Sequence, residues 1–315
     1  MMKRRFLVGS RESPLALRQT EWLLSRLKET CPHIAFEIRA VKTKGDKLTA
    51  VPLPEIGGKG LFTQELENLL FRREIDFAVH SLKDVPGELP AGLTLRTVGR
   101  REDPRDALIS RSGRPLAELP PGARLGTSSL RRAAQLRHLR PDLRIESLRG
   151  NLATRIHKLE SEGLDGIILA AAGLLRLGLE TKVTEYLPVS VCLPAAGQGA
   201  LGAECRADDA ETVSLLATVA HKPTELAATA ERTLLDRLGG GCRRPIAALA
   251  LWEGEILRLQ ALTADEDGRR LTRAEAAAAA RDEATAVALG ESAAALIAAR
   301  GGVVFAPVGG RSENE

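Results

Sequence analysis

The sequence is poor in aromatic residues, which make up 3% of its 315 residues. Its cores must therefore be built from aliphatic side chains, and a base-stacking surface for nucleic acid is disfavoured. The net charge of +4, from 45 basic and 41 acidic residues, is too small to indicate a nucleic-acid partner. We expect no nucleic-acid binding.

Cysteine is scarce as well: the four cysteines, at positions 31, 192, 205 and 242, include no C-x-x-C pair. This spacing argues against a zinc site and against a disulfide framework, so no metal is expected. There is no recognisable signal peptide and no apolar run long enough to span a bilayer. These absences predict a soluble protein of a reducing compartment that does not contact a membrane.

The length suits two or three domains. Strand and helix patterns alternate from residue 5 to about residue 170, which predicts α/β architecture with largely parallel sheets. Residues 99–106 and 193–199 resemble domain boundaries. Residues 42–60 have no periodicity and are either a mobile functional loop or a lid. The Ala-rich residues 273–299 are predicted to form one or two amphipathic helices.

Two glycine-rich motifs do not indicate phosphate binding. Residues 197–202 fit G-x-G-x-x-G, but they follow a Pro-containing loop and lack the acidic residue expected about twenty positions later. Residues 58–61 lack the Ser or Thr that a P-loop needs after its lysine. We interpret the first motif as a hinge.

Arginine recurs where strands are expected to turn into helices. The positions are Arg11, Arg131, Arg132, Arg149, Arg155 and Arg176. Positive charge in the first turn of a helix opposes the helix dipole unless an anion is bound there, and arginine binds carboxylates bidentately. Each could be a solvated surface residue, but their recurrence favours a polycarboxylate or phosphate site. A DNA-recognition helix at residues 129–140 is a weaker alternative, since no helix-turn-helix pattern precedes it.

Two other residues could carry chemistry. Cys242 follows three glycines at a helix-to-strand corner beside Arg243 and Arg244, and nearby guanidinium groups lower a thiol's pKa and make it a nucleophile. On the residues alone, an ordinary cysteine in a turn is the commoner outcome. Asp84 follows a predicted strand beside Lys83, where it could stabilise a cation or move a proton. It could equally cap a turn.

Ordered motifs along nearly the whole chain resemble the porphobilinogen deaminase (hydroxymethylbilane synthase) family. They are GSRESPLALRQ (9–19), KTKGD (42–46), GGKGLFTQELE (57–67), DFAVHSLKDVP (76–86), REDPRDALIS (101–110), GTSSLRRAAQL (126–136), PDLRIESLRGNLATRIHKL (141–159), GIILAAAGLLRLGL (166–179), LPAAGQGALGAECR (193–206) and GGCRRPIAAL (240–249).

The resemblance implies two α/β domains like periplasmic binding proteins, with mixed, largely parallel sheets, and a small C-terminal α+β domain. Domain 1 would comprise residues 1–99 and 200–219, domain 2 residues 100–199, and domain 3 residues 220–315. The implied protein is a cytoplasmic transferase, expected to be a monomer. It joins four porphobilinogen molecules head to tail, releasing ammonia, into linear hydroxymethylbilane.

The resemblance also implies a covalent dipyrromethane cofactor, attached by a thioether to Cys242, and a catalytic carboxylate at Asp84. The residues that match the family's cofactor contacts are Lys83, Ser129, Arg131, Arg132 and Arg155. Those that match contacts to carboxylates of the substrate and the growing polypyrrole chain are Arg11, Ser13, Arg149 and Arg176. Lys59 and Phe62 match the lid.

The chain departs from the family's pattern after its cysteine, where Arg243-Arg244 replaces the commoner Gln-Val. We hypothesise that one of these arginines adds a carboxylate contact to the cofactor. A non-catalytic binding protein for a small carboxylate is the rival interpretation, because fold alone does not fix function. A reactive thiol on a third domain would distinguish the two.

Overall fold

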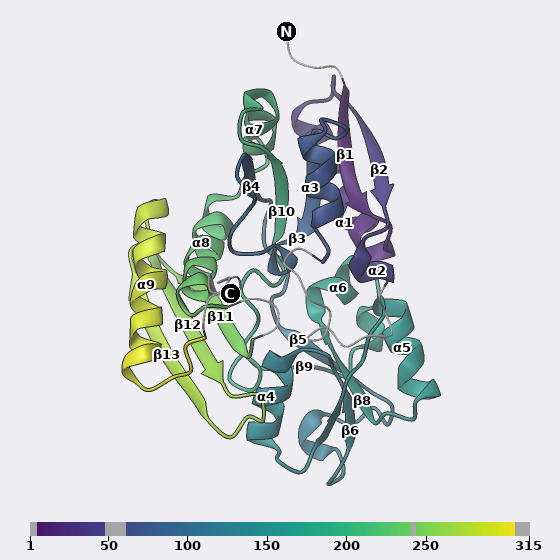
Figure 1. Cartoon of the computed structure of the whole chain (residues 1–315). Coiled ribbons are helices and arrows are strands. Elements are labelled where there is room, and N and C mark those ends of the chain that lie inside the picture. The colour runs from purple at the N-terminus through teal and green to yellow at the C-terminus, as the bar shows by residue number, and fades with distance from the viewer. Residues whose placement is uncertain (1–4, 48–60, 241–243, 306–315) are drawn as a thin grey trace, which may run out of the picture.

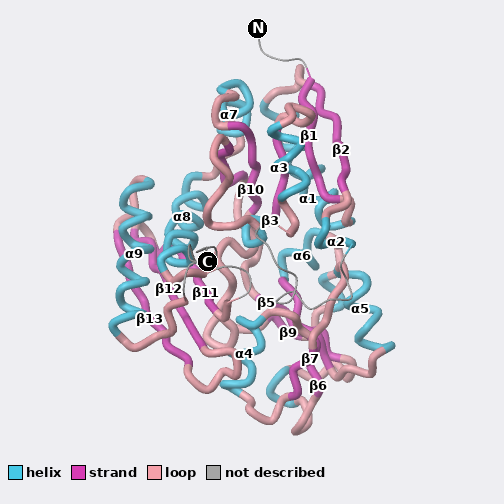
Figure 2. Tube along the Cα trace, in the orientation of Figure 1, coloured by secondary structure: helices cyan, strands magenta, loops and turns pink. Residues whose placement is uncertain are grey.

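A computed structural model describes residues 5–47, 61–240 and 244–305. These residues form two five-stranded mixed sheets and one three-stranded antiparallel sheet, each covered by helices (Figures 1 and 2). The predicted α/β class, with a small C-terminal α+β part, is confirmed. None of the described helices has the length and apolar character needed to cross a membrane.

The first sheet has the order β2-β1-β3-β10-β4. Its strands are β1 (Arg5–Arg11), β2 (Ala35–Val41), β3 (Phe77–Ser81), β4 (Leu93–Val98) and β10 (Leu201–Arg206). Strands β1, β2 and β3 are mutually parallel, whereas β10 is antiparallel to both β3 and β4. Its helices are α1 (Pro14–Thr30), α2 (Lys44–Lys47), α3 (Gln64–Phe71) and α7 (Ala210–Ala217), with a 3-10 turn η1 at Leu82–Asp84.

The second sheet repeats this arrangement, with the order β7-β6-β8-β5-β9. Its strands are β5 (Asp106–Ser110), β6 (Arg124–Gly126), β7 (Arg144–Glu146), β8 (Gly166–Ala170) and β9 (Glu185–Tyr186). Again three neighbouring strands, β7, β6 and β8, are parallel, and β5 is antiparallel to both β8 and β9. Its helices are α4 (Leu130–Leu139), α5 (Leu152–Ser161) and α6 (Ala171–Arg176), with 3-10 turns η2 (Leu116–Glu118) and η3 (Glu180–Lys182).

Two crossing segments join these sheets. One leads from β4 to β5 and the other from β9 to β10, and they contact each other because the backbone N–H of Glu102 donates to the carbonyl of Gly199 at 3.1 Å. Gly199 has a positive φ of 87°, and a Cβ there would lie 2.4 Å from the Glu102 oxygen. The glycine is therefore required where the two segments touch.

The third sheet is a meander of β11 (Ile246–Glu253), β12 (Ile256–Ala264) and β13 (Leu271–Ala278). Alternate residues face opposite sides of a strand, so Ala248 and Ala250 pack with helices α8 (Lys222–Arg237) and α9 (Glu283–Ala299). Ala247 and Leu249 pack instead with Ala134 of α4. The third sheet is thus held between helices α8 and α9 on one face and helix α4 of the second sheet's layer on the other.

The sequence-based expectation of helix throughout residues 273–299 is wrong. Residues Leu271–Ala278 form strand β13, which pairs with β12 from Leu257↔Ala278 to Ala264↔Leu271, and only Glu283–Ala299 is helical. Alanine has the highest helix propensity, but the ladder with β12 and the packing of α9 on β13 outweigh that local preference.

Candidate active site

The predicted site residues follow the carboxyl ends of parallel strands. Arg11 ends β1, Lys83 and Asp84 follow β3, Ser129, Arg131 and Arg132 follow β6, Arg149 and Arg155 follow β7, and Arg176 follows β8. Parallel strands gather such turns at one edge of a sheet, the usual ligand position in open α/β sheets. In Figure 1 the carboxyl ends of β1 and β2 in the first sheet point toward the second sheet and its helices.

Local capping fixes two of these turns. The Ser13 hydroxyl accepts a hydrogen bond from the backbone N–H of Ala16 at 3.3 Å, with Pro14 at the first position of α1. Ser129 caps α4 in the same way, accepting from the backbone N–H of Arg132 at 3.4 Å. Both caps orient the first turn of a helix toward the site.

Asp84 lies in a small pocket with side chains from both α1 and β3. Its neighbours are Arg11, Gln19, Phe62, His80 and Ser81. Gln19 and Ser81 hydrogen-bond to each other at 2.9 Å, which fixes that wall of the pocket. Among the described residues, none donates a hydrogen bond to the Asp84 carboxylate. Its oxygens can therefore accept hydrogen bonds from a ligand.

Arg11 has a partner in the chain itself. Its guanidinium donates to the Asp46 carboxylate, with Nη2 2.5 Å from Oδ1, and lies 4.3 Å from the Phe62 ring centroid. Burial acts to raise the pKa of Asp46, but hydrogen bonds from Arg11 and Thr43 hold it below its ordinary value. Asp46 therefore stays ionised and shares Arg11 with any substrate carboxylate.

Arg131 and Arg132 converge on Asp106, the first residue of β5. Arg131 Nη1 lies 2.7 Å from Oδ2, and Arg132 Nη2 lies 2.7 Å from Oδ1. Burial opposes ionisation of Asp106, yet the two guanidinium groups lower its pKa far below the ordinary value. An anion was expected at the start of this helix, and the chain itself supplies one carboxylate for the two arginines.

Three other cations near the site, Lys83, Arg155 and Arg176, are half-buried. Burial lowers the pKa of Lys83 to about 8, and it lowers the pKa of both Arg155 and Arg176 to about 10. Arg155 is close enough to Asp84 for that carboxylate to oppose the effect, but three other arginines reinforce it. A cluster of cations partly withdrawn from water favours an anionic ligand.

Helix α8 of the third unit docks directly behind Asp84. Arg232 donates hydrogen bonds to the carbonyl oxygens of Val85 at 3.1 Å, Pro86 at 2.7 Å and Gly87 at 3.1 Å. The loop that contains Cys242 follows this helix. Cys242 itself, Lys59 and the rest of the predicted lid beyond Lys47 lie outside the described residues, as does Arg243. Arg244 lies 4.8 Å from the Phe305 ring centroid.

The residue patterns did not single out Asp106, Gln198 or Gln19. Gln198 donates to Asp106 at 2.9 Å and accepts from Lys83 Nζ at 3.4 Å, so it bridges the two halves of the site. All three lie inside motifs quoted for the family resemblance, which was the available signal. Periodicity could not find them because each acts through a partner far away in the sequence.

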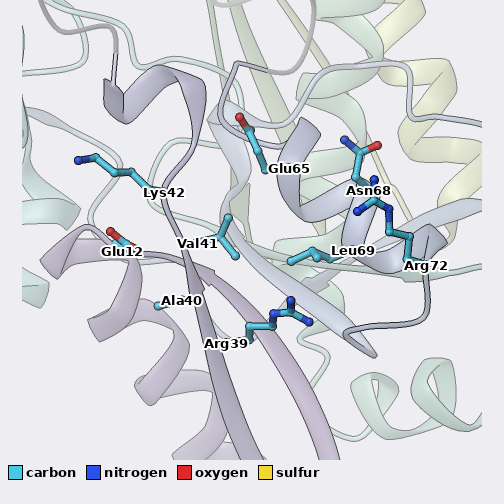
Figure 3. A pocket seen from close by; sticks show the side chains of 9 residues that line it. All are labelled: Glu12, Arg39, Ala40, Val41, Lys42, Glu65, Asn68, Leu69 and Arg72. Atoms are coloured by element: carbon cyan, nitrogen blue, oxygen red, sulfur yellow. The ribbon is translucent and has the colours of Figure 1, made fainter.

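A larger pocket of about 430 Å³ lies apart from this cluster, between the end of β2 and helix α3 (Figure 3). Arg39, Lys42 and Arg72 line it together with the carboxylates of Glu12 and Glu65, so its charges nearly balance.

Among the described residues no group of three or more His, Cys, Asp or Glu side chains could hold a metal ion.

Comparisons with known proteins show which family the chain resembles. The family model "Porphobilinogen deaminase, dipyromethane cofactor binding domain" matches residues 6–214, and "Porphobilinogen deaminase, C-terminal domain" matches residues 225–299. A porphobilinogen deaminase of Desulforamulus reducens is 54% identical over 87% of this chain and 89% of its own length. One of Pelotomaculum thermopropionicum is 50% identical over 86% and 87%.

A solved structure, the alkanesulfonate-binding protein SsuA from Xanthomonas axonopodis pv. citri bound to MOPS, superposes with a TM-score of 0.41 at 13% identity, covering 75% of this chain and 76% of that one. The two family models together extend over most of the chain, in the order expected for a single protein. The chain belongs to the porphobilinogen deaminase family.

Proposed function

We propose that the residues between the two α/β sheets hold a dipyrromethane cofactor and extend it with porphobilinogen, with Asp84 as the catalytic carboxylate. The protein is a porphobilinogen deaminase, which joins four porphobilinogen molecules into hydroxymethylbilane with release of ammonia. The observation that carries the assignment of residues is the cluster of cations that lies around Asp84, in which Arg155 feels the charges of Arg11, Arg132, Arg149 and Asp84.

The donor set fits the cofactor. A dipyrromethane carries an acetate and a propionate on each ring, hence four carboxylates. Lys83, Arg131, Arg132 and Arg155 provide four cations, of which Asp106 neutralises one. Ser129 adds a hydroxyl at the start of α4. Guanidinium groups bind carboxylates bidentately, so this set suits a small polyanion better than a neutral ligand.

The bound cofactor supplies a nucleophilic pyrrole carbon to which porphobilinogen is added. Asp84 accepts hydrogen bonds from pyrrole N–H groups and stabilises positive charge as ammonia leaves, because no side chain or backbone N–H among the described residues donates to its oxygens. Arg11, Ser13, Arg149 and Arg176 hold acetate and propionate groups of the substrate and growing chain. Phe62, which lines the pocket of Asp84, is proposed to contact the ligand, and Lys59 remains the lid residue that the family resemblance implies.

Cys242 is the proposed attachment residue, through a thioether. Support comes from helix α8, because its Arg232 binds the segment that follows Asp84. The loop after this helix, which leads to Cys242 in the sequence, therefore begins near the site. Of the two arginines that follow Cys242, one was expected to contact a carboxylate of the cofactor. Arg244 contacts Phe305, so Arg243 is the better candidate for a cofactor contact.

We also propose three domains, comprising residues 1–99 with 200–219, residues 100–199, and residues 220–315. The return of β10 to the first sheet supports the split first domain. A cytoplasmic, monomeric enzyme is proposed as well. Support for a reducing compartment comes from Cys31, Cys192 and Cys205, which are all free and buried.

Intact-mass spectrometry tests the proposal. The wild-type protein should carry the extra mass of two linked pyrrole units and gain further pyrrole units with porphobilinogen. Cys242→Ala should lose this mass, whereas Cys31→Ala, which alters a cysteine of the first unit, should keep it. Asp84→Asn should retain the cofactor and lose elongation. A wild type that gains no mass with porphobilinogen or hydroxymethylbilane would favour the rival, a carboxylate-binding protein.

A further inference from the structure

Asp106 is a fully buried carboxylate that accepts hydrogen bonds from four different side chains. Oδ2 accepts from Arg131 Nη1 at 2.7 Å and from the Cys192 thiol at 3.2 Å. Oδ1 accepts from Arg132 Nε at 3.0 Å and Nη2 at 2.7 Å, and from Gln198 Nε2 at 2.9 Å. Both oxygens are therefore saturated, and Asp106 has no capacity left for a ligand.

The two arginines are strongly constrained by this arrangement. Arg131 also donates to the carbonyl of Leu193 at 2.7 Å, and Arg132 donates to the carbonyl of Ile168 at 2.9 Å. Both side chains are almost completely buried. An arginine normally has many rotamers, so a carboxylate that accepts from two of them at once fixes their directions as well as compensating their charge.

The Asp106 carboxylate is also linked to the ammonium group of Lys83, through the side-chain amide of Gln198. Gln198 lies on the segment between β9 and β10, and its amide nitrogen donates to Asp106 and to the Pro104 carbonyl, the latter at 2.7 Å. This orients its amide oxygen, which accepts from Lys83 Nζ at 3.4 Å. Lys83 lies in the turn that follows β3 of the first sheet, whereas Asp106 begins β5 of the second sheet and its two arginines lie on α4.

The thiol of Cys192 stays protonated beside this carboxylate. Burial, reinforced by the charge of Asp106, raises the pKa of Cys192 to about 12. Cys192 therefore acts as a donor to Asp106 and not as a second nucleophile. The whole group is a closed set of donors around one acceptor.

We propose that Asp106 is the positioning residue of the cofactor site: it sets the directions of Arg131 and Arg132 and, through Gln198, of Lys83. This inference rests on the proposed assignment of these three cations to the cofactor. For cofactor binding after removal of Asp106, this proposal and a simple count of charges predict opposite changes. Removing Asp106 adds net positive charge, so simple attraction would strengthen binding of a polyanion, whereas loss of positioning weakens it.

The test is Asp106→Asn, which keeps the shape but presents an amide group to side chains that are all donors. The apo-protein is incubated with hydroxymethylbilane, whose hydroxymethyl carbon forms a C–S bond to the protein's thiol with release of water. The fraction of protein that carries a covalent polypyrrole is followed by intact mass. We expect loading at least tenfold slower than in the wild type at a temperature where both are folded. Loading that is as fast or faster in Asp106→Asn overturns the inference.

Asp209→Asn is the matched control. Asp209 is also nearly buried and ion-paired, to Arg206 at 2.6 Å, but it begins α7, which Figure 1 shows far from α4. Asparagine retains the cap of that helix, so this variant should lose stability and load at the wild-type rate. If even the wild type fails to load, the proposed function is wrong, which separates the two failures.

A second variant covers the case in which Asp106→Asn does not fold. Gln198→Met removes the bridge to Lys83 while leaving the Asp106 contacts of both arginines in place. It should fold and load several-fold more slowly than the wild type. A wild-type loading rate in Gln198→Met would show that the position of Lys83 does not depend on this network, and would overturn the inference.

Discussion

The charge of Lys83 should make ligand binding depend on pH. Burial, with the nearby positive charges of Arg132 and Arg131, lowers its pKa to about 8, while Asp84 and Asp106 oppose the shift. The amine is therefore mostly protonated at pH 7 and mostly neutral at pH 9. An anionic ligand favours the protonated form, so binding raises the pKa of Lys83 and takes up a proton above pH 8.

The size of the effect follows from that pKa. With a pKa of about 8, the protonated fraction falls from about 0.9 at pH 7 to about 0.1 at pH 9. A ligand that requires the ammonium should bind about tenfold more weakly at pH 9, which corresponds to about 1.4 kcal/mol. The sign for folding is opposite: because the folded pKa lies below the unfolded one, stability of the ligand-free protein rises between about pH 8 and pH 10.5.

Porphobilinogen binding to a Cys242→Ser variant, measured by titration calorimetry at pH 7, 8 and 9, tests this without covalent attachment. Lys83→Arg in the same background is the control, because arginine keeps its charge over this range. We expect a tenfold loss of affinity with lysine and a flat profile with arginine. An affinity that does not change with pH, or an equal loss with arginine, would refute the assignment of the pKa to Lys83.

Three predictions concern stability. Glu231 is fully buried and accepts from Arg101 at 2.5 Å and from two backbone N–H groups, so Glu231→Gln should cost about 3–5 kcal/mol in chemical denaturation; a cost below about 1 kcal/mol would contradict a buried pair. Gly199→Ala should lower the midpoint of thermal unfolding, with a cost of about 2 kcal/mol or more, because φ is 87° and the new Cβ would clash with the Glu102 carbonyl. An unchanged midpoint would mean that the crossing segments tolerate separation. Asp282→Ala should cost about 1 kcal/mol by loss of the capping box of α9, whereas Asp282→Asn should retain most of it; equal losses in the two would rule out capping as the cause.

Local signals in the sequence predicted much of the fold. The alternation of strand and helix patterns predicted the α/β class, and serine, a residue type favoured as an N-cap, does cap α1 at Ser13 and α4 at Ser129. These features depend on a few neighbouring residues, so the sequence determines them directly. Strand β13 was missed for the same reason, since an alanine-rich segment has helical propensity and only its pairing with β12 makes it a strand.

The sequence by itself determined that arginines follow successive strands, that an aspartate and a lysine end β3, and which family the motifs resemble. Only the tertiary structure decided how these charges pair. Arg131 and Arg132 meet a carboxylate 25 and 26 residues away, and Arg11 meets one 35 residues away. No local pattern sets such distances, because the partner of a buried charge depends on which chain segments the packed sheets bring together.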